Sequence, residues 1–157
     1  MSHTAAIALG SNLASSFGDR AANLREALHR LCVLGEIKDI STFHDTEPVD
    51  YLDQPRFLNA AALLETPLGP EDLMQGLLDI ERGMGRERSD IPAKGPRVID
   101  LDLLLYDNRI LSTADLTLPH PAMHERLFVL EPLNEIAPTM THPVLKLTVT
   151  EMMRRLS

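Results

Sequence analysis

Hydrophobic and polar positions along this chain alternate in some segments and repeat every three to four residues in others. Apolar or alternating runs predict strands at residues 4–9, 37–44, 57–66 and 98–106. Apolar stripes at helical spacing predict helices at residues 19–34, 70–84, 123–130 and 148–156. The pattern of residues 57–66 fits a helix or a strand. We favour a strand, because Pro67 and Gly69 follow it and a clearer helix begins at Pro70.

Signals at the ends of these segments support the predicted elements. Asp19 is a candidate N-cap of the first helix, and Gly35 is placed to end it. Pro70 fits the first turn of the second helix, and Thr148 is a candidate N-cap of the last. The turn-forming residues 10–12 are expected to end the first strand.

The order of elements predicts the fold class. Strand, helix, strand, strand, helix and strand follow one another up to residue 106, and residues 108–118 are typical of a turn with short strands. This order favours an α+β fold, a ferredoxin-like βαββαβ sheet with helices packed on it and a C-terminal extension. A length of 157 residues fits one domain, which we expect to span residues 1–157.

The strand at residues 98–106 carries two carboxylates in an apolar setting. Alternation predicts that one face carries Asp100, Asp102, Leu104 and Tyr106, and that the other carries Ile99, Leu101, Leu103 and Leu105. The two carboxylates then lie roughly 7 Å apart, a span that one or two divalent ions can bridge while they coordinate phosphate oxygens. The alternative is a pair of exposed carboxylates on a strand. Arg97 adds a fork of donors suited to phosphate.

Charge narrows the possible partners. A net charge of −8 and an isoelectric point near 5.1 argue against nucleic acid and anionic membranes. Of the 15 Lys and Arg residues, five lie close together in the sequence: Arg82, Arg86, Arg88, Lys94 and Arg97. A local basic cluster in an acidic chain indicates a small anionic ligand, although a solvated run of charges is the alternative.

Cysteine usage and hydropathy indicate the compartment. Cys32 is the single cysteine, which excludes an internal disulfide, and its spacing predicts a place in the core beside the first helix. The sequence shows no secretory leader and no apolar run of about 20 residues, so we expect a cytoplasmic protein.

Further motifs surround the aspartate pair and extend nearly from end to end of the chain. They are Ala8-Leu9-Gly10-Ser11-Asn12-Leu13, Asp53-Gln54-Pro55-x-Phe57-Leu58-Asn59-Ala60-Ala61, Ile80-Glu81, Gly85-Arg86-x-Arg88, Gly95-Pro96-Arg97-x-x-Asp100-x-Asp102 and Pro119-His120-Pro121-x-Met123-x-x-Arg126-x-Phe128. In their order and spacing they closely resemble the 6-hydroxymethyl-7,8-dihydropterin pyrophosphokinase family of folate biosynthesis.

This resemblance implies a reaction. Members of the family transfer the β,γ-pyrophosphoryl group of ATP as one unit to the primary hydroxyl of the pterin and release AMP. The resemblance also implies two Mg²⁺ ions held by Asp100 and Asp102, and a monomer.

The alternative is a non-catalytic module that binds nucleotide or pterin. The presence of both aspartates and of Arg97 argues against this alternative. The spacing of Gly10-Ser11 from the aspartates excludes a nucleotidyltransferase.

The resemblance also assigns residues to the ATP side. The expected ATP-binding residues are Glu81, Arg86, Arg88, Lys94, Arg97, His120 and Arg126. Arg86 and Arg97 would neutralise charge in the transition state, and Asp100 is a candidate proton acceptor, so these three are the expected catalytic residues. Ordinary surface or structural roles are the alternatives for Glu81, Arg88 and His120.

On the pterin side, the resemblance implies a ring stacked between Phe57 and Phe128, with the amide of Asn59 at its edge. The expected pterin-binding residues are Gly10, Thr46, Pro48, Val49, Phe57, Asn59 and Phe128. The chain departs from some relatives in having Lys94 and Pro121 where they carry Trp and Tyr, and Phe57 where Tyr is common. Lys94 offers a phosphate contact in place of the aromatic ring.

Overall fold

The computed structural model describes residues 2–46, 55–85 and 97–157. The elements of the described residues are β1 (His3–Ser11), α1 (Arg20–Leu31), β2 (Glu36–Ile40), β3 (His44–Thr46), β4 (Phe57–Thr66), α2 (Pro70–Gly83), β5 (Asp100–Tyr106), β6 (Leu111–Ser112), β7 (Thr117–Leu118), the 3-10 helix η1 (Met123–Glu125), α3 (Leu127–Ile136) and α4 (Val149–Leu156).

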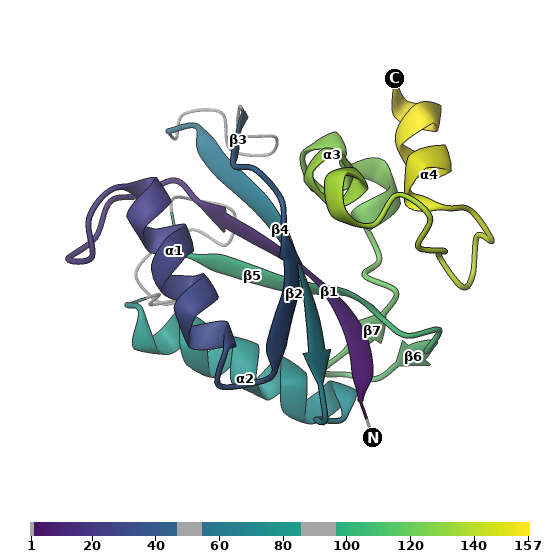
Figure 1. Ribbon diagram of the computed structural model, residues 1–157, viewed down its shortest axis with the longest axis horizontal. Helices are drawn as coiled ribbons and strands as arrows, with labels where there is room; N and C mark the ends of the chain where they lie inside the picture. The colour runs from purple at the N-terminus through teal and green to yellow at the C-terminus, as the bar shows by residue number, and fades with distance from the viewer. Residues whose placement is uncertain (1, 47–54, 86–96) are drawn as a thin grey trace.

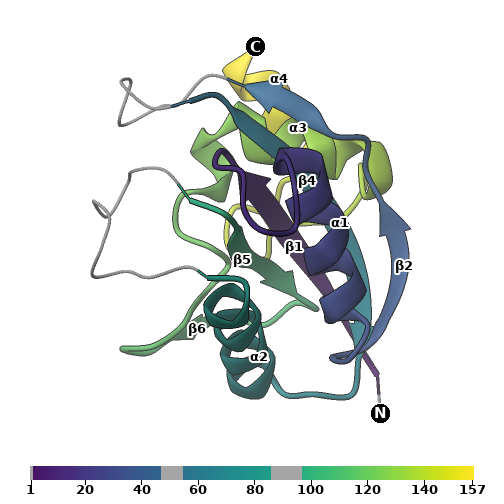
Figure 2. The same cartoon turned by 90° about the vertical axis from the view of Figure 1, so that its left-hand side faces the viewer.

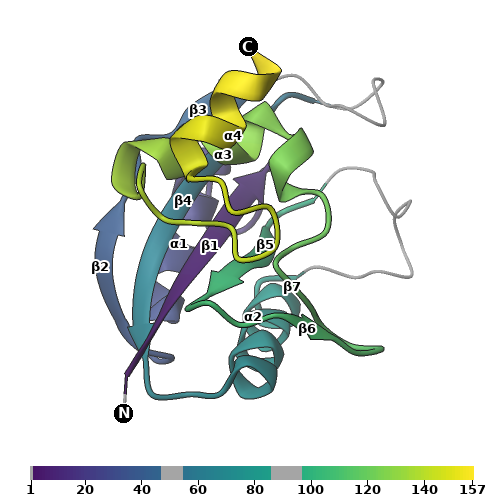
Figure 3. The same cartoon turned by 90° about the vertical axis from the view of Figure 1, so that its right-hand side faces the viewer.

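An antiparallel sheet forms the centre of the structure. Its strands run in the order β2, β4, β1, β5, and β3 pairs with β4 beyond the end of β2 (Figure 1). Helices α1 and α2 cover one face of this sheet (Figure 2). Helices α3 and α4 cover part of the other face (Figure 3). The predicted α+β class is therefore confirmed.

Each face of the sheet has its own apolar core. Ile7 and Leu9 of β1 pack toward α1 and α2, together with Leu24 and Leu77 of those helices. The alternate residues of β1 on the opposite face are small, and Ala6 packs against α3 and α4. Because the side chains of a strand alternate, this pattern of large and small residues along β1 leaves room on the face that α3 covers only in part.

The predicted helix ends are largely confirmed. The Asp19 side chain accepts a hydrogen bond from the backbone of Ala22, and Thr148 forms a capping box with Glu151. Helix α1 ends at Leu31, before the expected limit. Cys32 occupies its C-cap and is exposed, so the prediction that Cys32 lies in the core is wrong.

Two predicted strand limits are also wrong. Strand β1 continues through Gly10 to Ser11, because pairing with neighbours on both sides outweighs the turn propensity of these residues. The predicted strand at residues 37–44 is divided into β2 and β3. Ser41 lies between the two strands. Its hydroxyl accepts a hydrogen bond from the backbone N–H of Ala61 at 2.9 Å, in place of a backbone–backbone bond between strands.

A register shift in β5 changes which side chains share a face. Leu103 pairs with Ile7 and Leu105 pairs with Ala6, so Leu104 is an extra residue in β5. Leu104 and Leu105 both join the core under α3, whereas Tyr106 joins the core under α2. The predicted faces are therefore correct through Leu104 and wrong for the last two residues of the strand.

The C-terminal part also differs from the prediction. The helix expected at residues 123–130 is η1 followed by α3, which continues to Ile136. Arg126 separates the two with an extended backbone. Helix α3 extends past Pro132 because Leu133, one turn further on from Val129, is completely buried.

Candidate functional site

Gly10 of β1 joins two halves of the candidate site. It pairs with Asn59 of β4 on one side and with Asp100 of β5 on the other. Directly opposed residues of antiparallel strands share a face, so the amide and the carboxylate lie on either side of the glycine. A Cβ atom at Gly10 would lie 3.1 Å from Asn59 Oδ1 and 3.7 Å from Phe57 Cδ1. The missing side chain therefore keeps this part of the sheet open.

The residues expected on the pterin side lie around Asn59. Asn59 is 7 % exposed, and its Nδ2 donates a hydrogen bond to Thr46 Oγ1 at 2.6 Å. Phe57 pairs with Thr46 across β3 and β4. Phe128, in the first turn of α3, is half-buried against the core on the same face of the sheet. Two aromatic rings and a fixed amide are thus carried by β4 and by the helix over it.

The residues expected on the phosphate side lie around β5. Arg97 Nη1 lies 3.3 Å from Asp100 Oδ2, and these side chains are 13 % and 26 % exposed. His120 Nε2 lies 3.9 Å from Asp102 Oδ1. The backbone N–H of His120 donates to Leu104 O at 2.9 Å, which fixes the histidine beside β5. The Nε of Arg97 is buried and has no hydrogen-bond partner among the described residues.

Glu81 lies at the end of α2 and reaches the backbone of β5. It is 3 % exposed, and its Oε2 accepts the N–H of Leu101 at 2.7 Å. Leu101 separates Asp100 from Asp102, so Glu81 supports the strand between the two carboxylates. This contact ties β5 to α2 at the residue between the two aspartates.

Burial and a neighbouring positive charge favour the neutral form of the His120 side chain. Burial lowers its pKa from 6.5, and the positive charge of Arg126 lowers that pKa further, while Asp100 acts in the opposite direction. Arg126 also lies over the ring of Phe128, with its guanidinium carbon 5.6 Å from the ring centroid. Arg126 is therefore close to both the histidine on the phosphate side and the ring on the pterin side.

The chemistry of the donor set fits magnesium bound together with a substrate. Within residues 2–46, 55–85 and 97–157, no group of three or more His, Cys, Asp and Glu side chains is arranged to hold a metal ion. Mg²⁺ commonly takes one or two carboxylates and completes its coordination with water and substrate phosphates. Asp100 and Asp102, half-buried on one face of β5, match that sparse requirement.

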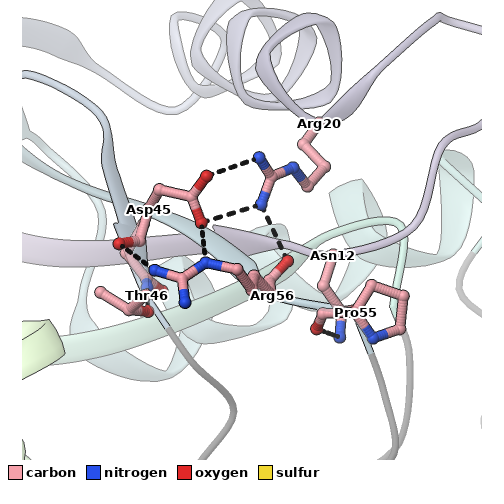
Figure 4. A network of polar contacts seen from close by, with 7 residues as sticks. Asn12, Arg20, Asp45, Thr46, Pro55 and Arg56 are labelled. Carbon is pink, nitrogen blue, oxygen red and sulfur yellow. Dashed lines mark hydrogen bonds and ion pairs between the residues drawn. The ribbon is translucent and has the colours of Figure 1, made fainter.

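A charged network next to the site was not predicted from the sequence. Asp45 of β3 accepts hydrogen bonds from Arg20 Nη2 and Arg56 Nε, both at 2.9 Å (Figure 4). Arg20 Nη1 also donates to the backbone oxygen of Arg56 at 2.9 Å. The two arginines lower the pKa of Asp45 to about 2. The network holds together α1, β3 and the start of β4, next to Thr46.

Asn12 was also missed as a residue of the site: its motif contributed to the family resemblance, but the residue itself was interpreted as part of a turn. It is 2 % exposed, and it forms hydrogen bonds with Arg97 and Pro55. The signal available in the sequence was the amide side chain of Asn12, in a segment that was expected to be an exposed loop. Its partners lie far from it in sequence.

Some predicted residues are not placed by the structure. Pro48, Val49, Arg86, Arg88 and Lys94 lie outside the described residues. The residues that the structure does bring together on or beside one end of the sheet are Gly10, Thr46, Phe57, Asn59, Glu81, Arg97, Asp100, Asp102, His120, Arg126 and Phe128.

A pair of aspartates, an arginine and a histidine beside one strand of an α+β sheet supply the metal ligands and positive charge that proteins transferring phosphoryl groups use. Comparisons with known proteins agree with this class. The family model described as "7,8-dihydro-6-hydroxymethylpterin-pyrophosphokinase (HPPK)" matches residues 6–138. The chain therefore belongs to this family, which confirms the resemblance found in the sequence.

Individual relatives support the assignment. The 2-amino-4-hydroxy-6-hydroxymethyldihydropteridine pyrophosphokinase of Bacillus subtilis is 44 % identical over 139 residues, which cover 87 % of this chain and 79 % of the relative. The Folic acid synthesis protein FOL1 of Dictyostelium discoideum is 40 % identical over 146 residues, which cover 93 % of this chain and 21 % of the relative. The chain thus spans about a fifth of that longer relative.

A solved structure agrees in fold. The Plasmodium falciparum HPPK-DHPS wild type with pteroate superposes with a TM-score of 0.78 at 15 % identity. The match covers 99 % of this chain and 44 % of that one. At this level of identity the likeness supports the fold alone.

Proposed function

We propose that this chain transfers the β,γ-pyrophosphoryl group of ATP to the hydroxymethyl group of 6-hydroxymethyl-7,8-dihydropterin, giving AMP and the pterin diphosphate. The observation that carries this proposal is the position of Gly10 between Asn59 and Asp100 in the sheet. A flat heterocycle held at Asn59 would present its substituent toward the aspartate pair, across a residue without a side chain.

The pterin would lie on the face of β4 that α3 partly covers. Phe57 and Phe128 supply aromatic faces, and Asn59 supplies an amide that both donates and accepts hydrogen bonds. The bond from Asn59 Nδ2 to Thr46 Oγ1 orients the amide. Asn59 Oδ1 is then directed to accept from an N–H of the ligand.

The triphosphate would lie along β5. Arg97 supplies a fixed positive fork, and Arg126 adds charge beside His120. Neutral His120 can donate one hydrogen bond to a phosphate oxygen without adding charge. Phosphoryl transfer depends chiefly on positioning and charge neutralisation, which these residues supply. Arg86, Arg88 and Lys94 remain predicted partners of the phosphates, and Pro48 and Val49 remain predicted partners of the pterin.

Asp100 and Asp102 would hold two Mg²⁺ ions together with the phosphates of ATP. When bound, such ions neutralise phosphate charge and make the acceptor hydroxyl more acidic. Asp100 is the candidate acceptor for the hydroxyl proton, because it lies nearest to the pterin half of the site across Gly10.

Incubation with ATP, Mg²⁺ and 6-hydroxymethyl-7,8-dihydropterin, followed by chromatography that separates AMP from ADP, tests this function. We expect AMP to form only when the pterin is present. Formation of ADP would indicate single phosphoryl transfer and would contradict the proposal. Binding of both ligands without turnover would favour the alternative, a non-catalytic binding module.

Further properties expected from the sequence belong to this proposal. The strand order β2, β4, β1, β5 with α1 and α2 on one face supports a ferredoxin-like description of the βαββαβ part. A single domain, a monomer and a cytoplasmic location without nucleic acid or membrane partners remain predictions. No helix within the described ranges has the length and apolar character needed to cross a bilayer.

A further inference from the structure

Asn12 is a buried polar residue to which the proposed reaction assigns no role. It directly follows β1 and is 2 % exposed. Buried amides are retained where their hydrogen bonds are satisfied, and an unsatisfied one is costly. The partners of Asn12 therefore indicate why an amide occupies this position.

The first partner of Asn12 is the backbone of Arg97. The N–H of Arg97 donates to Asn12 Oδ1 at 2.7 Å, and the N–H of Asn12 donates to Arg97 O at 3.0 Å. Both the N–H and the carbonyl oxygen of Arg97 are therefore hydrogen-bonded to Asn12. The side chain of Arg97 extends from this pinned backbone to lie 3.3 Å from Asp100.

The second partner is the backbone of Pro55. Asn12 Nδ2 donates to Pro55 O at 3.1 Å, a contact drawn in Figure 4. Pro55 precedes Phe57, the first residue of β4, by two positions. One side-chain amide thus accepts from the backbone on the phosphate side and donates to the backbone on the pterin side.

Helix α1 holds the segment around Asn12 in place. Asn23 of α1 is completely buried, and its Nδ2 donates to Ser11 Oγ at 3.2 Å and to Leu13 O at 2.8 Å. The residues on both sides of Asn12 are therefore anchored to a helix. The backbone that carries Asn12 is therefore held in place by α1, and so is the amide that binds Arg97 and Pro55.

We propose that Asn12 is a positioning residue for the transfer reaction, because its amide sets the Arg97 backbone at a fixed distance from the start of β4. This inference rests on the proposed function. The reacting phosphorus and the pterin hydroxyl must approach closely, and small misplacements of supporting groups can cost about a hundredfold in rate. Asn12 acts through Arg97 and Pro55 and does not itself need to touch a substrate.

Two substitutions distinguish the bond to Arg97 from the bond to Pro55. Asn12→Ala removes both the acceptor for Arg97 and the donor to Pro55. Asn12→Asp keeps an acceptor for the Arg97 N–H, loses the donor to Pro55 and adds a negative charge at a buried position. We expect kcat to fall about tenfold to a hundredfold in Asn12→Ala and by a smaller factor, above about threefold, in Asn12→Asp. The Kd of ATP alone is expected to stay within about threefold of the wild type.

Thr66→Val is the matched control. Thr66 is also completely buried and also bonds to backbone, donating to Leu34 O at 2.6 Å and accepting from Leu68 N at 3.1 Å. It lies at the opposite end of β4 from Asn59. We expect this variant to lose stability in urea unfolding while its kcat stays within about threefold of the wild type.

The outcomes separate this inference from the proposed function. A wild-type enzyme that makes no AMP contradicts the proposed function before any variant is compared. If the wild type is active, an Asn12→Asp enzyme with wild-type kcat overturns the positioning role, because the bond to Pro55 would then be dispensable. The same comparison decides the matter if Asn12→Ala fails to fold. A reduced kcat in folded Asn12→Asp, with ATP binding retained, supports the role.

Discussion

Asp100 and Asp102 project from one face of β5, on either side of the residue whose N–H is held by Glu81. If they hold the metal ions of the reaction, neither can be replaced by a side chain without oxygen ligands. We expect Asp102→Ala to lower kcat by at least about a hundredfold, because the charge stabilisation of the transferring group is lost. The measurement is AMP release at saturating ATP and pterin, with circular dichroism as the check on folding.

Asp79→Ala supplies the control for Asp102→Ala. Asp79 is an exposed carboxylate of α2, 3.5 Å from the side chain of Arg82. Its substitution by alanine removes the same negative charge at a position away from the site. Its kcat should stay near that of the wild type. A folded Asp102→Ala enzyme that turns over as fast as Asp79→Ala would refute the metal assignment.

Gly10 permits a second test at a single position. A methyl group there would lie 3.1 Å from Asn59 Oδ1, closer than ordinary contact, so the amide or the strand must shift. We expect Gly10→Ala to weaken pterin binding by about tenfold or more while the Kd of ATP changes little. Titration of each ligand separately, by calorimetry, gives the two dissociation constants.

Gly69→Ala is the control for Gly10→Ala. Gly69 is the N-cap of α2, and a Cβ there meets no atom within 4 Å. Its pterin affinity should match that of the wild type. Equal pterin affinity in Gly10→Ala and Gly69→Ala would show that the ring does not lie over Gly10.

Single residues of the site were predictable to different degrees. Asp100 and Asp102 were predicted as metal ligands because two charges in an apolar strand are costly without a ligand. The amide of Asn59 was predicted as a ligand contact through its motif, whereas its bond to Thr46 depends on the pairing of β3 with β4. The role of Asn12 could not be predicted, because a turn propensity says nothing about distant backbone partners.

Strand β3 is short, and the Asp45 network contributes to holding it on β4. Hydrogen bonds from Arg20 and Arg56 lower the pKa of Asp45 to about 2, against 3.8 for the free side chain. Because the pKa of Asp45 is lower in the folded state than in the unfolded state, its carboxylate stabilises the fold at pH values above the unfolded-state pKa. This stabilisation is lost as the pH falls from 3.8 toward about 2.

We therefore expect Asp45→Asn to be less stable than the wild type at neutral pH, with the difference shrinking as the pH falls from about 4 to about 2. The measurement is the free energy of urea unfolding of both proteins across that range. Asp79→Asn, on the exposed face of α2, should differ little from the wild type at any pH. A difference for Asp45→Asn that does not change with pH would contradict the assigned ion pairs.

Among the helices and strands, local signals predicted what depends on local chemistry. The caps Asp19 and Thr148 were correct, because a capping side chain bonds within its own helix. The division of residues 37–44 depends on the bond between Ser41 and Ala61, and the shift at Leu104 depends on pairing with β1. Both are contacts between strands, which periodicity in one segment does not record.

For the molecule as a whole, the order of elements predicted the α+β class, and motifs far apart in the sequence predicted one site. The structure brings Gly10, Asn59 and Asp100 together because β1 lies between β4 and β5. The sequence did not predict the contacts that Asn12 and Asp45 make between segments. These contacts are hydrogen bonds between residues separated by up to 85 positions.

The measurement to make first is ³¹P NMR of a reaction containing the protein, ATP, Mg²⁺ and 6-hydroxymethyl-7,8-dihydropterin. The proposed function predicts equal amounts of AMP and of a pterin ester with two coupled phosphorus signals, and no product with the Asp102→Ala enzyme. A monophosphate ester with ADP, or unchanged ATP in the presence of both bound ligands, would contradict pyrophosphoryl transfer by this chain.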